Sequence, residues 1–337
     1  MTAILAMSDF LRAPTHGTAR PRGFKEWQHF VVHGRGGHFL INFSLNNEGA
    51  NDLLVPRVIV IGHDGTWTGV VERFDDADFD VAANLGDLTI GGNRMTLRPD
   101  GYHVIIDLPG SGISGEIDFT SVSRPFVVNN QPLGEGRLSW LFVPRLRATG
   151  WLRISGDEHR FDGDLAYHDH NWGRFQWGDD FGWTWGTILP RSSHDPWSMV
   201  FLQMTDRKRL RCLSKALYVW RNEEPAGLYR HSAVQTHFRG ALAGGADCTL
   251  PAPMRMLLDG DVPGVPEVVE VTASGGEDRV RAEFRSQSYA RLAKPSEVHL
   301  DRSIVLCETN GTVHVSGSIQ GEDVDFVGDG VFEFFYG

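Results

Sequence analysis

The chain has 337 residues, of which 41% are hydrophobic and 22% are charged, a composition typical of a globular protein with a sizeable core. Its formal net charge of −11 argues against binding to nucleic acid or to an anionic membrane, because both attract basic surfaces. The sequence contains no window of about 18 uncharged apolar residues, so no transmembrane helix is expected.

The N-terminal stretch MTAILAMSDFLRAPTHG lacks the positive n-region and the long apolar segment of a secretory signal. The three cysteines, Cys212, Cys248 and Cys307, are widely spaced and odd in number. This is typical of reduced thiols and not of a disulfide framework or a zinc knuckle. We therefore expect a cytoplasmic protein.

In chain order, a short helix is predicted at residues 7–13, strands and turns follow, and a second short helix is predicted at 253–260. In HFLINFSL the apolar residues Phe39, Ile41, Phe43 and Leu45 alternate with other side chains, and RVRAEFRS alternates in the same way at 279–286. This period of two is typical of half-buried antiparallel strands. Turns are predicted at HDGT (63–66), GGN (91–93), PDG (99–101), SGD (155–157), SGGED (274–278) and TNG (309–311).

The many strands and short polar turns predict an all-β fold of antiparallel barrels or sandwiches. The length favours two domains of ordinary size. We expect an N-terminal tail at residues 1–23, a first domain at 24–175 and a second at 176–337. The boundary follows the sequence YHDHNWG, which would then lie at the domain junction, where clefts usually form.

YHDHNWG occupies residues 167–173 and is the most unusual sequence in the chain, because side chains this costly to bury are rarely packed together without a reason. If the stretch is extended, its side chains divide between the two faces of a strand. One face carries His168, His170 and Trp172, and the other carries Tyr167, Asp169 and Asn171.

Three interpretations of this motif remain open. A His-x-His pair offers two imidazoles to a metal ion, but the next acid along the chain is Asp179, so a third ligand has to come from elsewhere in the fold. A carboxylate beside imidazoles in a dry aromatic cleft is also suited to acid–base chemistry. Finally, the polar groups could satisfy one another as a hydrogen-bonded corner of the fold.

Tryptophans are concentrated next to the motif, with five of the ten lying between residues 172 and 197. Indole faces bind flat apolar ligands and stabilise cations, although tryptophans also fill the floor of a barrel. The five are Trp172, Trp177, Trp183, Trp185 and Trp197.

Together with these markers, the motif resembles the lipocalin-like family that includes carotenoid 1,2-hydratase (hydroxyneurosporene synthase). The resemblance covers roughly residues 25–190. The seven-residue motif is specific, whereas the other markers are individually weak. They are Glu26-Trp27, Trp140 with Pro144, Gly150, Gly156, Gly163 and Trp183-x-Trp185.

The resemblance implies two lipocalin-like β domains and cofactor-free chemistry on hydrophobic polyenes. Carotenoid hydratases of the family add water to an isoprenoid double bond, and related proteins guide cyclisations, including Diels–Alder reactions. By carry-over, His170 and Asp169 are acid–base candidates, with Tyr167 and His168 beside them, and Trp172 is the cation-stabilising wall.

Two departures from the family pattern separate this chain from a carotenoid hydratase. Gln28 and His29 follow the early Glu-Trp where the family continues with aromatic residues. The Tyr-x-Asp expected beyond the tryptophans is replaced by Met204-x-Asp206, which leaves Asp206 as a further catalytic candidate.

We expect a cofactor-independent enzyme that cyclises, isomerises or hydrates an isoprenoid or polyketide polyene. Carotenoid hydration proper and non-catalytic carriage of a hydrophobic ligand are the alternatives, and no metal is expected. The only expected partner is a hydrophobic small molecule, and the oligomeric state is left open. Substrate-binding candidates are Trp27, Gln28, Asn171, Trp172, Trp177, Trp183 and Trp185, while Asp179 and Asp180 are expected in a turn.

Overall fold

The computed structural model describes residues 9–13, 21–34, 37–48, 53–243, 246–247, 264–299 and 301–336. The chain divides into two compact units, Met1–Gln176 and Trp177–Gly337. The described residues form strands and three short 3₁₀ helices, and all strand pairs but one are antiparallel. The predicted all-β, lipocalin-like fold class is therefore confirmed.

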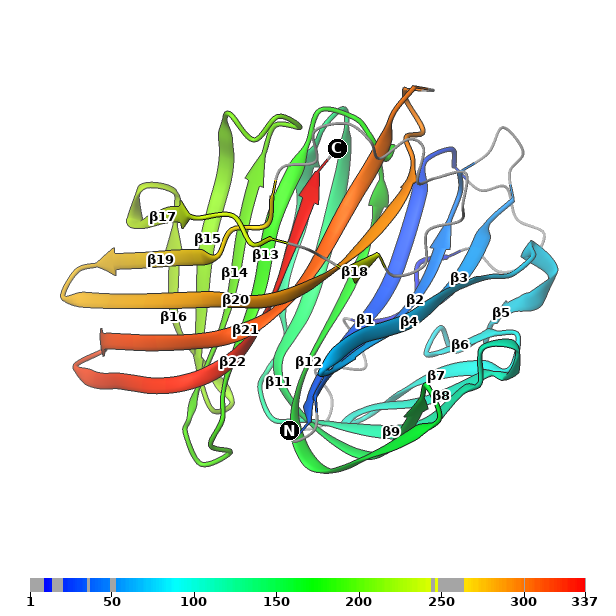
Figure 1. Ribbon diagram of the computed structural model, residues 1–337, viewed down its shortest axis with the longest axis horizontal. Helices are drawn as coiled ribbons and strands as arrows, with labels where there is room; N and C mark the ends of the chain where they lie inside the picture. The colour runs from blue at the N-terminus through cyan, green and yellow to red at the C-terminus, as the bar shows by residue number, and fades with distance from the viewer. Residues whose placement is uncertain are drawn as a thin grey trace. The chain divides into compact units, whose positions relative to one another are not determined.

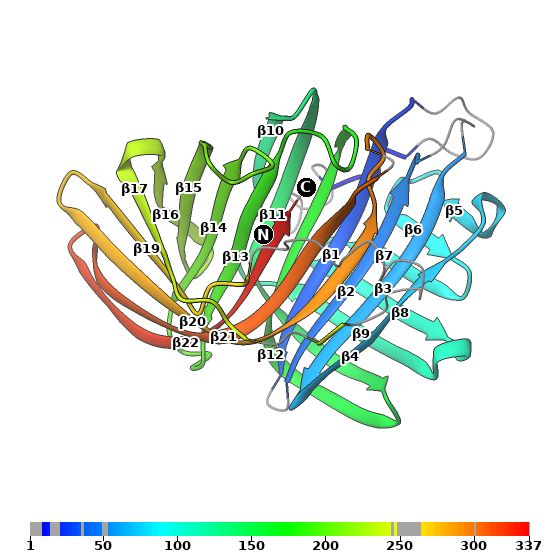
Figure 2. The same ribbon diagram turned by 45° about the horizontal axis from the view of Figure 1, so that its top comes forward.

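The described part of unit 1 forms one twelve-stranded sheet in the order β4-β3-β2-β1-β12-β11-β9-β8-β7-β6-β5, with β10 paired to β11 (Figure 1). Figure 2 shows the sheet curling, so that β5–β9 fold across from β1–β4. The elements are β1 (Phe24–Gly34), β2 (Gly37–Asn46), β3 (Val55–Asp64), β4 (Thr66–Arg73), η1 (Asp76–Asp78), β5 (Phe79–Val81), β6 (Asp87–Ile90), β7 (Asn93–Arg98), β8 (Gly101–Leu108), η2 (Pro109–Ser111), β9 (Ile113–Ser121), β10 (Phe126–Leu133), β11 (Gly136–Ile154) and β12 (Asp157–Arg174).

The inner face of the curled sheet holds the apolar core of unit 1. In HFLINFSL, Phe39, Ile41, Phe43 and Leu45 are all at most 1% exposed and belong to this core, as the alternation predicts. The strand is nevertheless buried on both faces and not half-buried as predicted, since Leu40, Asn42 and Ser44 are also buried. The long strands β11 and β12 pair over nearly their whole length and form the centre of the sheet. β12 pairs on its other side with β1, so the motif lies in the middle of the sheet and not at an edge.

The described part of unit 2 forms a ten-stranded sheet in the order β16-β15-β14-β13-β22-β21-β20-β19-β17, with the two-residue β18 paired in parallel to β20. Val280, Ala282 and Phe284 of the second alternating sequence are buried in its core, as predicted. The elements are β13 (Gly182–Pro190), β14 (Trp197–Thr205), β15 (Cys212–Arg221), β16 (Glu224–Arg230), η3 (His231–Ala233), β17 (Val234–Arg239), β18 (Ala246–Asp247), β19 (Val268–Gly275), β20 (Asp278–Pro295), β21 (Ser303–Ile319) and β22 (Glu322–Tyr336).

Two local predictions were wrong. The described residues of the first predicted helix, 9–13, are irregular, and the Leu11 amide donates to the carbonyl of Leu85, 2.9 Å away, instead of closing a helical turn. TNG lies inside β21 and forms no turn. Gly311 is needed there because a Cβ would lie 2.1 Å from the carbonyl oxygen of Arg285 on the paired strand. The second predicted helix, 253–260, lies outside the described residues.

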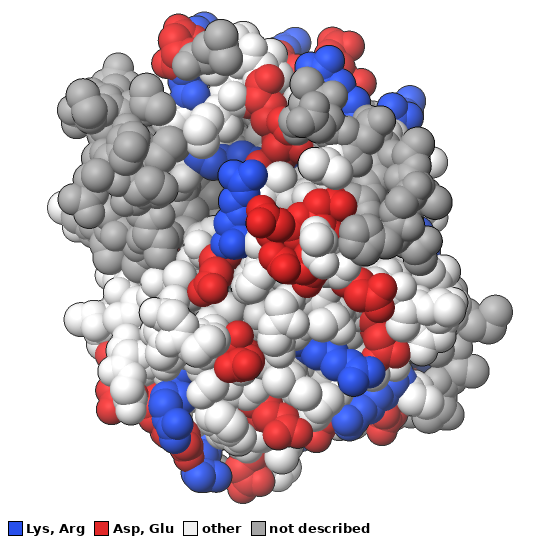
Figure 3. Space-filling view, turned by 90° about the vertical axis from the view of Figure 1, so that its right-hand side faces the viewer, with Lys and Arg blue, Asp and Glu red and all other residues white. Residues whose placement is uncertain are grey.

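Charged side chains of both signs are interspersed on the face drawn in Figure 3. No continuous basic stripe crosses this face, in keeping with the net charge of −11. Among the described residues, no helix is long and apolar enough to cross a membrane.

Candidate functional site

The motif YHDHNWG is part of β12, and its side chains divide between the two faces of the sheet as predicted. The inner face carries His168, His170 and Trp172, and the outer face carries Tyr167, Asp169 and Asn171. The register places Gln28 of β1 and Leu141 of β11 on either side of His170. The two faces have different partners and different chemistry.

On the inner face, His170 is held between two carboxylates. Its Nδ1 lies 2.5 Å from Oδ1 of Asp9, and its Nε2 lies 2.8 Å from Oε1 of Glu26. All three side chains are at most 1% exposed. Burial alone lowers the pKa of an imidazole, but the two carboxylates outweigh it and raise the pKa of His170 to about 9. At neutral pH the ring is an imidazolium that donates both of its N–H groups.

Asp9 brings further inner-face groups together. It accepts a hydrogen bond of 2.6 Å from the hydroxyl of Tyr102, and Nε2 of His168 lies 3.4 Å from it. Although burial opposes the charge, His170 and His168 hold the pKa of Asp9 well below its ordinary value. Burial lowers the pKa of His168, whose Nδ1 donates over 3.0 Å to the carbonyl oxygen of His29.

On the outer face, Asp169 is the centre of a smaller polar group. It accepts hydrogen bonds from the hydroxyl of Tyr167 at 2.9 Å and from the amide of Asn171 at 2.5 Å. Its register partner on β1 is His29, and Nδ1 of His29 lies 3.4 Å from Nδ2 of Asn42 on β2. Burial and the nearby His168 lower the pKa of His29 to about 3. A neutral imidazole therefore neighbours a hydrogen-bonded carboxylate.

Accessibility also separates the two faces. A group that exchanges a proton with a substrate must come within hydrogen-bonding reach of it. His168, His170 and Gln28 on the inner face are 0% exposed, so they are out of reach. On the outer face Tyr167 is also 0% exposed, whereas four groups keep a small accessible surface: Asp169 5%, Asn171 6%, His29 6% and Asn42 8%.

Aromatic side chains flank the outer-face group. Trp27 of β1 and Trp140 of β11 are the two register partners of Asn171. Trp140 packs at 4.4 Å against Phe142, the register partner of Asp169 on β11. Trp172, in contrast, faces inward, where its ring centroid lies 4.8 Å from that of His170 and the guanidinium of Arg12 lies over it at 4.9 Å.

The other predicted site residues belong to unit 2. Trp177 and Trp183 form an aromatic cluster with Phe181 and Phe335, in which Trp183 stacks on Phe335 at 4.3 Å. The indole of Trp183 donates to Glu333, and Trp185 is buried two residues along the same strand.

Asp206 organises the turn after β14. It accepts hydrogen bonds from the backbone amides of Leu210 at 2.7 Å and Arg211 at 3.1 Å. The bond from Arg211 is the main reason that the pKa of Asp206 is lowered. This environment favours a stable carboxylate over a proton donor. Asp179 and Asp180 lie in a turn, as predicted.

Sequence analysis missed five polar members of the two groups. A lone aspartate in an N-terminal tail and a tyrosine 65 positions before the motif give no local signal. Glu26 and His29 could have been found, because Glu26 is the neighbour of Trp27 in the chain and His29, two residues further on, shares the strand face of Trp27. The five missed residues are Asp9, Glu26, His29, Asn42 and Tyr102.

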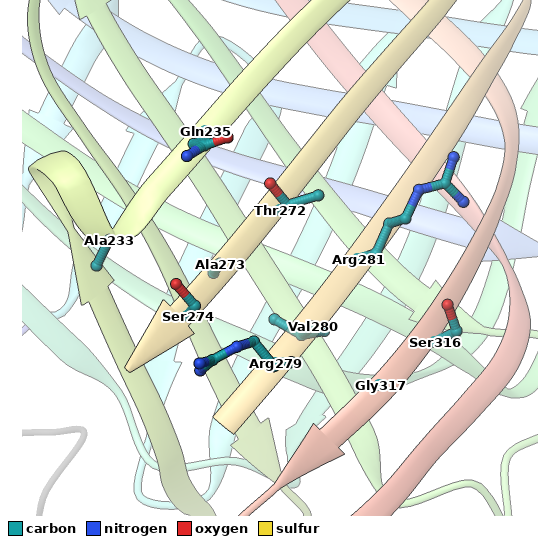
Figure 4. Close-up of a pocket in the computed structure, with 10 residues that line it drawn as sticks. All are labelled: Ala233, Gln235, Thr272, Ala273, Ser274, Arg279, Val280, Arg281, Ser316 and Gly317. Atoms are coloured by element: carbon teal, nitrogen blue, oxygen red, sulfur yellow. The ribbon is translucent and has the colours of Figure 1, made fainter. Parts of the chain in front are cut away.

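Within the described ranges, no three His, Cys, Asp or Glu side chains converge in a way that would hold a metal ion. Both ring nitrogens of His170 are occupied by carboxylates, so this ring has no lone pair to offer. A hollow of about 400 Å³ lies on unit 2 (Figure 4). Its Arg281 is paired with Glu270 and Glu283, and its Arg279 donates to the backbone carbonyl oxygens of Gly276 and Asp278.

No protein-family model and no curated protein matches the sequence. Solved structures do match. An AttH-type protein from Nitrosomonas europaea has a TM-score of 0.64 and 13% identity, with 100% of both chains covered. Kievitone hydratase from Nectria haematococca has a TM-score of 0.59 and 12% identity, covering 100% of this chain and 96% of that one.

The structure of CghA with Sch210972 is also similar, with a TM-score of 0.59 and 12% identity, covering 100% of this chain and 97% of that one. These similarities establish a shared fold over the full length, which confirms the fold that the sequence resemblance implied.

Proposed function

We propose that this protein is a cofactor-independent enzyme that uses acid–base chemistry to cyclise or isomerise a hydrophobic isoprenoid or polyketide polyene. The observation that carries the proposal is the outer-face group, in which neutral His29 neighbours Asp169 and tryptophans flank both. A carboxylate with two hydrogen-bond donors, beside an uncharged imidazole, can take a proton from one atom of a substrate and return it to another.

The surroundings suit an apolar, conjugated substrate. Trp27 and Trp140 offer indole faces next to the polar group, and such faces bind flat ligands and stabilise positive charge as it develops. The amide of Asn171 and the hydroxyl of Tyr167 fix the orientation of Asp169, which leaves its position well defined before a substrate arrives.

The fold supports the same class of chemistry. One structure that shares it is a hydratase and another was solved with the small molecule Sch210972. Hydration needs the same acid–base groups as isomerisation, with water as the nucleophile. Carriage of a hydrophobic ligand without reaction would need the tryptophans but not Asp169 or His29.

The experiment compares Asp169→Asn and His29→Gln with the parent protein on a panel of terpenoid and polyketide polyenes, using mass spectrometry of the products. A product of unchanged mass indicates cyclisation or isomerisation, and a gain of one water indicates hydration. We expect each variant to lose about a hundredfold or more in turnover while still binding the polyene.

Asp162→Asn is the matched control, because Asp162 lies on the same strand, outside the motif, and is exposed. It should retain full turnover. Binding without turnover in the parent protein would identify a carrier, and unchanged turnover in Asp169→Asn would refute the proposed site.

A further inference from the structure

The N-terminal segment Asp9–Ala13 is built into unit 1. Leu11 and Ala13 are 2% and 3% exposed and belong to its apolar core. The backbone amide of Arg12 donates to Oε1 of Glu26 over 2.6 Å, and the amide of Leu11 donates to Leu85. The segment therefore contacts the strand β1 that carries one of the two carboxylates around His170.

Asp9 is the residue of this segment that contacts the histidines of β12, while Arg12 contacts Trp172 of the same strand. Its two carboxylate oxygens receive His170 at 2.5 Å and Tyr102 at 2.6 Å, with His168 at 3.4 Å. These three side chains come from β12 and β8, so one carboxylate links two strands of the sheet to the N-terminal segment. Loss of these partners would leave an uncompensated buried charge on Asp9, which is strongly destabilising. The fold is therefore most stable when Asp9 keeps these three contacts.

The charges facing His170 can be counted from every element that packs on it. Asp9 and Glu26 are anionic, His168 is uncharged at neutral pH, Tyr102 is a neutral donor, and the Arg12 guanidinium lies beyond Trp172. Without Asp9, Glu26 would be the only carboxylate in contact with His170 to offset the cost of burying its positive charge. His170 would then lose both a hydrogen bond and half of its counter-charge.

The backbone of β12 connects His170 on the inner face with Asp169 on the outer face. His170 lies between Asp169 and Asn171 in the chain, and the side chains of successive strand residues point to opposite faces. A change in the position of His170 therefore changes the backbone that orients Asp169.

We propose that Asp9 is a positioning residue for the outer-face site: by holding His170 from the inner face, the N-terminal segment fixes Asp169 and Tyr167 in their hydrogen-bonded geometry. The inference rests on the proposed function for its catalytic meaning. It adds a residue that touches no substrate and lies about 160 positions away in the sequence.

The test is an NMR titration of Asp9→Asn, which keeps the shape of the side chain and removes its charge. The ring nitrogens of His170 and the carboxyl carbon of Asp169 are followed in the folded, ligand-free protein. We expect the pKa of His170 to fall from about 9 toward its ordinary 6.5, and the carboxyl signal of Asp169 to move away from its position in the parent.

Asp162→Asn is again the matched control and should leave both signals unchanged. Tyr102→Phe removes one hydrogen bond that positions Asp9 and keeps the charge of Asp9, so it should move both signals by less than Asp9→Asn does. It also keeps the test available if Asp9→Asn does not fold. A shift of His170 without any change at Asp169 in either folded variant would overturn the inference.

Turnover separates this inference from the proposed function. If Asp169→Asn abolishes turnover and Asp9→Asn lowers kcat with little change in the affinity for retinol, a polyene probe, both hold. If Asp169→Asn abolishes turnover and Asp9→Asn keeps the parent's kcat and pH profile, the inference alone is wrong. If Asp169→Asn keeps full turnover, the proposed function is wrong, and the NMR result still decides whether Asp9 positions Asp169.

Discussion

The two faces of β12 carry neighbouring residues of one motif in opposite electrostatic states. On the inner face, His170 is charged because two carboxylates contact it. On the outer face, His29 is uncharged because burial and another histidine oppose a proton. Burial opposes a proton on both rings, so the difference in charge comes from the two carboxylates that contact His170.

The inner group is therefore suited to stabilising the fold, and the outer group to reacting with a substrate. The inner group is closed, since Asp9 and Glu26 occupy both nitrogens of His170 and nothing is exposed. A closed, fully buried ion cluster fixes a structure but cannot meet a substrate. The outer group keeps some accessible surface and contains a neutral base, which is what proton transfer requires.

Removal of His170 should have the largest effect on folding. His170→Ala leaves two buried carboxylates without their shared cation, and we expect the free energy of unfolding to fall by about 3–5 kcal/mol. Asp169→Asn keeps its shape and loses only part of a hydrogen-bonded group, so about 1 kcal/mol is expected. Urea unfolding of both variants measures the contrast, and equal losses would show that the two faces do not differ.

The charge of His170 also predicts a loss of stability in alkali. Its pKa is raised in the folded state, so its contribution is fully present below 6.5 and is lost as the pH rises through about 9. A rise of this size corresponds to roughly 3 kcal/mol. Unfolding free energies measured from about pH 6 to about pH 10 should show this decline in the parent and lack it in His170→Gln.

The sequence predicted the division of the motif between two faces, because the alternation of a strand depends only on its extended backbone. It did not predict which face is closed. That depends on Asp9 and Tyr102, which reach His170 and His168 from other elements and carry no local pattern. The same limit applies to TNG, whose glycine fits a turn as well as a close approach of two strands.

The tryptophans show a second limit of sequence reasoning. Their density indicated an aromatic wall, and Trp177 and Trp183 do cluster with other rings. Trp172, although it belongs to the motif, faces the inner group. Density along the chain identifies aromatic regions, but the partner strands decide the direction in which each ring points.

The neutral state of His29 predicts a loss of stability in acid. Its pKa is lowered in the folded state, so the unfolded chain gains a proton first and stability falls as the pH drops from 6.5 toward about 3. At about pH 5 the cost is roughly 2 kcal/mol. His29→Gln should remove this part of the acid sensitivity, whereas His194→Gln, at an exposed position, should not. Equal acid sensitivity in parent and His29→Gln would mean that His29 is charged in the fold.

Arg12→Ala should have the smallest effect and tests how closed the inner group is. The guanidinium lies over Trp172, and its loss should cost about 0.5–1 kcal/mol, while the backbone amide of residue 12 still donates to Glu26. A cation near His170 opposes the imidazolium, so its removal should raise the pKa of His170 slightly in the NMR titration. Arg12→Lys keeps the positive charge, so the pKa of His170 in this variant should be close to its value in the parent. If Arg12→Ala instead lowers the pKa of His170, solvent reaches the ring, and the inner group is open and could take part in the chemistry.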